Sequence, residues 1–162
     1  MAKADLSKIK QAYYIKLGRK GCWEKMCLKD GTLRLGYYGV PHKAGIKRDK
    51  DAICDLYLSK GKTKGAASDQ ARQVIDFYAA GPETLWITFT DGHLWWSQAK
   101  EDVEFLGSDR VKFPDGSRLR RTLNGWSCKS LSGKNLSTNE LSGKLTRSAA
   151  YKDNLRHQRR CF

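Results

Sequence analysis

The sequence predicts an α+β fold, a small, mostly antiparallel barrel or curved sheet with helices inserted between its strands. The first observation is the stretch 84–98, where apolar residues alternate with others on both sides of an Asp-Gly pair. The second is the helical apolar period of residues 68–80. The third is the element order: two strands, two helices, several strands and a helix. This order lacks the regular alternation of a doubly wound parallel sheet.

The stretch Thr84–Gln98 predicts a β-hairpin. A type I′ turn needs positive φ at both central residues, and Asp91-Gly92 suits it. Thr90 then pairs with His93, and side chains alternate between two faces. The apolar face is expected to carry Leu85, Ile87, Phe89, Leu94 and Trp96. The aromatic and polar face is expected to carry Trp86, Thr88, Thr90, His93, Trp95 and Ser97.

The remaining elements follow from local composition. Branched and aromatic residues favour strands, and capping residues mark helix starts. Before the hairpin we expect a strand (12–18), a basic glycine loop (18–21), a helical turn (22–28), a strand (32–38), a loop (39–47), a helix (49–59), a basic connection (59–65) and a helix capped by Ser68 (68–80). After it we expect strands (103–106, 110–113, 117–121) and a helix capped by Ser137 (137–147). Residues 1–150 thus form a single domain, and 151–162 a basic, partly disordered tail.

The charge distribution predicts a polyanionic partner. The 162 residues carry a net charge of +14. Residues 1–48 hold 12 basic and 3 acidic residues, 49–116 hold 8 and 12, and 117–162 hold 11 and 2. Two basic ends favour nucleic acid first and an anionic membrane surface second. No apolar run reaches the length of a membrane span, and no secretory signal is visible, so we expect a cytoplasmic protein.

Catalytic and metal-binding patterns are weak. The five cysteines form no CxxC pair, which favours reduced structural thiols over a zinc site, and no cofactor is expected. No Ser/His/Asp or Cys/His motif is recognisable. The acidic residues Glu101, Asp102 and Glu104 fit a solvated loop better than a metal site. Asp49-Lys50-Asp51 loosely matches a nuclease pattern, but on an expected helix. We therefore assign no catalytic residue.

Binding is better supported than catalysis. Aromatic side chains stack bases, and Lys and Arg bind phosphates. An extruded base costs least when it is damaged, modified or single-stranded. The candidate pocket residues are Trp23, Tyr38, Trp86, Trp95 and Trp126, each with the core as its alternative place. The candidate phosphate-binding residues are Arg19, Lys20, Arg118, Arg120 and Arg121.

Three segments together resemble an EVE-like domain of the PUA superfamily: Tyr14–Glu24, Leu33–Tyr37 and Leu85–Trp96. The resemblance covers roughly the first two-thirds of the chain. It implies a five- or six-stranded β-barrel with flanking helices, and an aromatic pocket for a flipped modified cytosine or, in related domains, a methylated adenine in RNA. It places pocket roles on Trp23, Tyr38 and a hairpin Trp, and a base-edge contact on Asp91.

The resulting hypothesis is a DNA-binding reader of 5-methyl- or 5-hydroxymethylcytosine. EVE-like domains occur in modification-dependent restriction systems. Because this sequence shows no nuclease module, a separate nuclease module or subunit is expected to cut the DNA. An RNA-binding PUA-like module is the first alternative, and a small metal-dependent nuclease the second.

Overall fold

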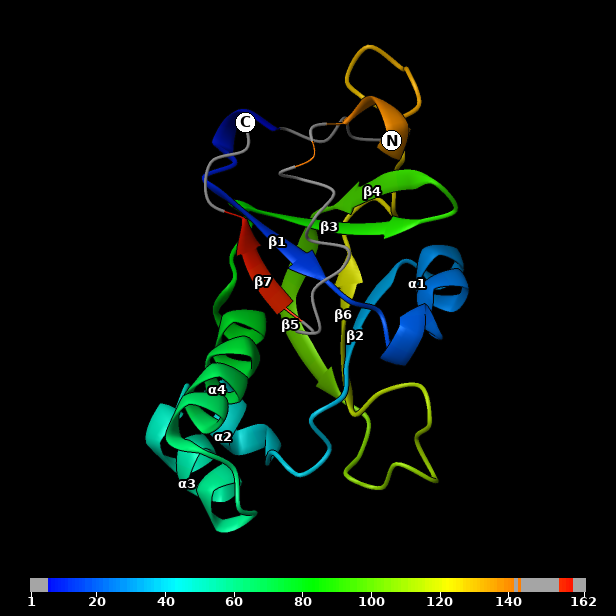
Figure 1. The fold of residues 1–162 in the computed structure, drawn as a ribbon. Coiled ribbons are helices and arrows are strands. Elements are labelled where there is room, and N and C mark those ends of the chain that lie inside the picture. The colour runs from blue at the N-terminus through cyan, green and yellow to red at the C-terminus, as the bar shows by residue number, and fades with distance from the viewer. Residues whose placement is uncertain (1–5, 142, 144–154, 159–162) are drawn as a thin grey trace.

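The computed structural model describes residues 6–141, 143 and 155–158 of the chain. Within this described part, seven strands form two sheets, and four α-helices lie at their sides (Figure 1). The first sheet has the order β4-β3-β1-β7, and the second β2-β6-β5. All strand pairs are antiparallel except β1 with β3. The predicted α+β, mostly antiparallel class is confirmed, while the hydrogen bonds of the described strands do not close a barrel.

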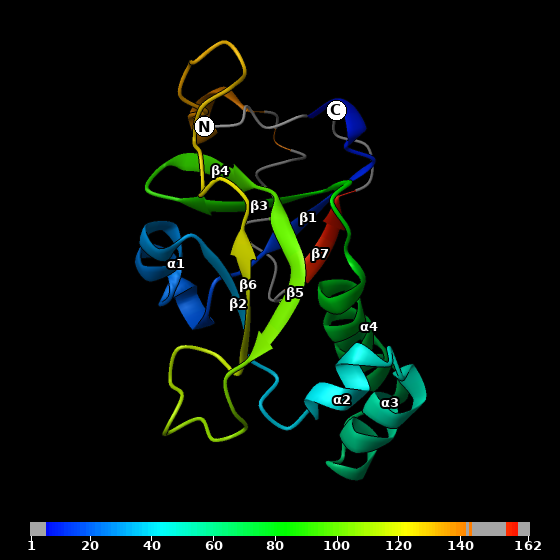
Figure 2. The ribbon, with the colours of Figure 1, turned by 180° about the vertical axis from the view of Figure 1, so that it is seen from behind.

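The strands are β1 (Gln11–Ile15), β2 (Thr32–Leu35), β3 (Thr84–Thr90), β4 (His93–Ser97), β5 (Ala99–Phe105), β6 (Arg118–Thr122) and β7 (Leu155–Gln158). The helices are α1 (Glu24–Asp30), α2 (His42–Ile46), α3 (Lys50–Ser59) and α4 (Lys64–Ala79), with short 3-10 turns η1 (Leu6–Lys8), η2 (Arg19–Gly21) and η3 (Thr138–Glu140). Helices α2, α3 and α4 gather on one side of the second sheet, and α1 lies on the other (Figures 1 and 2). Within the described ranges, every helix is too short or too polar to cross a bilayer.

The hairpin is confirmed in its register. Thr90 pairs with His93, and the pairing continues to Trp86 with Ser97. Asp91 and Gly92 have φ of 50° and 70°, as a type I′ turn requires. The apolar face packs against Ala12 and Tyr14 of β1 in one core cluster, as predicted from the alternation.

On the aromatic and polar face of the hairpin, Trp86 is not available to stack a ligand. Its side chain is fully buried, and it packs with Tyr13, Phe77 and Leu33 in the central core. Its indole nitrogen is the only buried side-chain polar atom of the described residues without a hydrogen-bond partner. Trp86 is therefore a core residue. The second sheet and α4 cover the aromatic and polar face of the hairpin at this position, which strand alternation alone could not predict.

Several boundaries differ from expectation. The loop expected at 39–47 contains α2. Helix α4 begins at Lys64, one turn before Ser68, because the Thr63 hydroxyl accepts a hydrogen bond from Ala66 N. Residues 110–113 are not a strand. The Asp109 carboxylate accepts from Val111 N at 2.9 Å, which turns the chain within the β5–β6 loop.

The C-terminal expectations are only partly covered by the described residues. Ser137 makes no side-chain cap, and the described part of the expected helix 137–147 contains the 3-10 turn η3 and a helical residue at Gly143. Residues 142 and 144–150 lie outside the described part. The tail was expected to be partly disordered, but 155–158 form β7 and pair antiparallel with β1.

Two arginines of β6 lie in the interior, which overturns their predicted role in binding phosphate. Arg118 and Arg120 are fully buried. Arg118 donates to Tyr78 Oη at 3.1 Å and to the carbonyls of Tyr37 and Val40 at 3.0 and 2.6 Å. Because residues two apart on a strand share a face, both guanidiniums point toward α4.

Arg120 joins three elements through main-chain oxygens. Its guanidinium donates twice to Lys100 O of β5, at 2.8 and 2.6 Å, and once to Phe77 O near the end of α4, at 2.9 Å. Burial lowers the pKa of Arg120 to about 10. These bonds offset part of the cost of burying the charge.

We expect Arg120→Met to destabilise the protein by roughly 2–3 kcal/mol, since hydrogen bonds to charged groups contribute about 1.5–3 kcal/mol and the carbonyl partners stay buried. The measurement is urea unfolding. Arg121→Met is the matched control, because Arg121 is exposed on the opposite face and pairs with Glu104. Equal stability of the two variants would contradict this role.

Three buried tyrosines predict loss of stability in alkali. Burial raises the pKa of Tyr13, Tyr14 and Tyr57 to about 12. Between about pH 10 and 12 the folded state keeps protons that the unfolded state releases, so stability falls by about 1.4 kcal/mol per pH unit per tyrosine. The lowered pKa values of Arg118 and Arg120 act in the opposite direction, but the pKa of Tyr78 is raised as well, so four tyrosines oppose two arginines.

Urea unfolding at a series of pH values above neutrality measures this effect, with tyrosinate absorbance reporting the titration. We expect stability to fall steadily above about pH 10. Constant stability up to about pH 12 would contradict the assignment of these rings to the core.

Candidate nucleic-acid-binding pocket

A pocket of about 330 Å³ opens between three segments that are distant in sequence. They are the end of β1 with the loop that follows, residues 35–38 after β2, and the β5–β6 loop near residues 110–114. Aromatic walls come from Trp23 and Tyr38, and basic side chains from Lys16, Arg19 and Arg110. No Asp or Glu of the described residues lines it.

Trp23 owes its position to Gly18. Gly18 has φ of 81°, and a Cβ there would lie 2.7 Å from Cys22 Sγ and 2.8 Å from Trp23 Cδ2. Only glycine permits both this backbone and this close approach. The indole nitrogen of Trp23 donates to Pro114 O at 3.2 Å, so the ring is tied to the β5–β6 loop.

Tyr38 is tied to the same loop. Its hydroxyl donates to Phe113 O at 2.6 Å and accepts from Gly116 N at 3.0 Å. The Arg110 guanidinium carbon lies 5.1 Å from the centroid of the Tyr38 ring, within the range of a cation–π contact. The two aromatic walls thus hold the loop that brings Arg110 to the pocket.

Gly36 lies between the two aromatic rings. A Cβ on Gly36 would be 3.9 Å from Trp23 Cη2 and 3.9 Å from Tyr38 Cε2. A glycine inside a strand pattern is typical of a bulge or of a close approach by another group. A side chain at this position would be in ordinary van der Waals contact with both rings.

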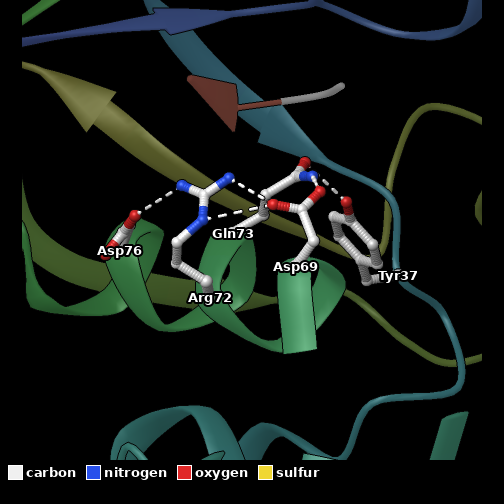
Figure 3. Close-up of polar contacts among 5 residues, drawn as sticks. All are labelled: Tyr37, Asp69, Arg72, Gln73 and Asp76. Atoms are coloured by element: carbon white, nitrogen blue, oxygen red, sulfur yellow. Dashed lines mark hydrogen bonds and ion pairs between the residues drawn. The ribbon is translucent and has the colours of Figure 1, made fainter. Parts of the chain in front are cut away.

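The segment after β2 is held from the helical side. Tyr37 has φ of 51°, and its hydroxyl donates to Gln73 Oε1 of α4 at 2.7 Å. Figure 3 shows how Gln73 continues to Asp69, which pairs with Arg72, and how Arg72 reaches Asp76. This polar network fixes Tyr37, and with it the chain that leads into Tyr38.

The structure brings Trp23, Tyr38 and Arg19 of the predicted site together. Trp95 and Trp126 are half-buried, and neither lines the pocket. Their indole nitrogens donate to Thr90 O and Thr32 O. Asp91 occupies the exposed hairpin turn, which accounts for its residue type.

The predicted basic residues separate into different places. Lys20 is exposed beside Arg19 in η2, outside the pocket lining. Arg121 is exposed and bound to Glu104 at 2.6 Å. The described residues contain no group of three His, Cys, Asp or Glu side chains close enough to hold a metal ion. Cys22, Cys27, Cys54 and Cys128 are free thiols, and Cys161 lies outside the described residues.

Sequence reasoning missed Lys16 and Arg110. Lys16 directly follows a strand of core residues, so it was not considered for the pocket. Arg110 was missed because residues 110–113 were interpreted as a strand. Asp109 in the sequence Ser-Asp-Arg at 108–110 did indicate a turn. Asp is typical of turns in which its carboxylate accepts hydrogen bonds from backbone amides that follow it.

Comparisons with protein-family models, with curated proteins and with solved structures found no match to this chain.

We expect Tyr38→Phe to loosen the β5–β6 loop while keeping the aromatic wall. The change removes two hydrogen bonds and leaves the buried amide of Gly116 without its acceptor, at a cost of about 1–3 kcal/mol. Hydrogen exchange should speed up at residues 113–116. Unchanged protection there would show that the hydroxyl does not hold the loop.

Proposed function

We propose that the chain binds duplex DNA and accepts an extruded, modified cytosine between Trp23 and Tyr38, with 5-methyl- and 5-hydroxymethylcytosine as the first candidates. The observation that carries the proposal is the pocket that these two rings line, beside a basic glycine loop. The volume of about 330 Å³ lies at the lower end of ligand pockets. Each stacked base contributes about 1–3 kcal/mol, comparable with the cost of extrusion.

Arg19 and Lys20 fit contacts to the flanking phosphates. Both are exposed in η2, a few residues before Trp23, so a backbone that passes the loop would present its nucleotide to the ring. Binding through such contacts weakens as salt rises, because counterions are released. In this proposal the chain is a PUA-like specificity module of a modification-dependent restriction system, and a separate nuclease cuts the DNA.

The test compares binding of one duplex whose central cytosine is unmodified, 5-methylated or 5-hydroxymethylated. We expect at least one modified duplex to bind about tenfold more tightly than the unmodified one, which corresponds to about 1.4 kcal/mol. Equal affinity for all three duplexes in fluorescence anisotropy, or preference for single-stranded RNA, would contradict the proposal.

Gly36→Ala provides the sharpest variant, because the new methyl group lies between the rings without positive φ. It should abolish the preference for the modified duplex and leave unmodified binding unchanged. Gly65→Ala in α4 is the control, since a Cβ there contacts nothing within 4 Å. Trp23→Ala should act like Gly36→Ala, whereas Trp96→Phe, on the opposite hairpin face, should not.

A further inference from the structure

The charge of the pocket suggests more about its ligand than the aromatic walls do. Lys16, Arg19 and Arg110 line it, and none of them forms an ion pair with another described residue. Each carries only hydrogen-bond donors. No carboxylate of the described residues lines the pocket, so its charged side chains offer positive charge and hydrogen-bond donors.

The nearest acidic side chain is directed elsewhere. Glu24 follows Trp23 directly, but its carboxylate accepts a hydrogen bond from Thr90 and lies close to Asp91 of the hairpin turn. In the β5–β6 loop, the Asp109 carboxylate accepts from Val111 N and Lys112 N. Glu24 also interacts electrostatically with Lys16, which leaves Arg19 and Arg110 as the pocket cations without an ion pair or another carboxylate contact among the described residues.

Arg110 differs from the phosphate-binding candidates in its position. Arg19 and Lys20 belong to the exposed loop η2, where a nucleic-acid backbone would pass. Arg110 lies against the ring of Tyr38, which is the surface that would stack the base. Its guanidinium is thus placed to meet the base itself.

The donor-rich lining discriminates between modified bases. Cytosine presents an exocyclic amino donor, and a methyl group adds neither charge nor acceptor. A carboxylate substituent adds two acceptor oxygens and a charge, which a guanidinium binds with two parallel hydrogen bonds. We propose that the pocket selects a pyrimidine with an anionic substituent, and that Arg110 is the residue that recognises the negative group. This inference rests on the proposed function and extends it to a class of base.

The experiment measures binding of four duplexes that differ only in the central cytosine: unmodified, 5-methyl, 5-hydroxymethyl and 5-carboxyl. Fluorescence anisotropy at one fixed salt concentration gives each affinity. We expect the 5-carboxyl duplex to bind about tenfold more tightly than the 5-methyl duplex. Arg110→Gln should reduce this ratio to about one, while Arg110→Lys should retain part of it.

Lys112→Gln is the matched control. Lys112 is an exposed cation two residues away on the same loop, and its ammonium group lies over Phe113 and outside the pocket. It should leave the ratio between 5-carboxyl and 5-methyl duplexes unchanged. Thermal unfolding of both variants confirms that each one folds.

The outcomes separate the two proposals. If a 5-methyl or 5-hydroxymethyl duplex binds as tightly as the 5-carboxyl duplex, and Trp23→Ala removes that binding preference, the inference is wrong and the proposed function stands. If Arg110→Gln weakens all four duplexes equally, Arg110 contacts phosphate and the inference is also wrong. If all four bind equally and Trp23→Ala changes nothing, both proposals fail.

Discussion

The structure depends on two buried guanidinium groups that have no carboxylate partner among the described residues. Arg118 and Arg120 carry charge into the interior, where it is costly unless hydrogen bonds replace the lost water. Their seven bonds reach β5, α4 and the segment after β2, mostly through main-chain oxygens. One strand, β6, thereby fixes the relative positions of the second sheet and the helical layer.

The same constraint shapes the pocket. Arg118 binds the carbonyls of Tyr37 and Val40, on both sides of Tyr38. Tyr38 in turn holds the β5–β6 loop through Phe113 and Gly116. A chain of contacts therefore runs from the core to the loop that carries Arg110. The core and the candidate site are parts of one arrangement, so a change in the buried arginines is expected to reach the pocket.

Sequence reasoning succeeded where the signal was local and failed where burial determined the role. Trp23 and Tyr38 were identified because aromatic residues beside glycine and basic residues fit a binding loop, and they do meet in one pocket. Arg118 and Arg120 were misassigned because Arg is exposed in most proteins. Nothing in Arg-Leu-Arg-Arg at 118–121 distinguishes a buried guanidinium from an exposed one such as Arg121.

The sequence by itself determined the hairpin, its register and its apolar face, because turn chemistry and strand alternation involve residues only a few positions apart. It also determined the basic character of the chain and two of its helices. Only the tertiary structure decided that Trp86 is core, that Arg110 lies beside Tyr38 and that Trp23 and Tyr38 line one pocket. Those facts depend on segments brought together from distant parts of the chain, and their contacts are specified by packing rather than by any local pattern.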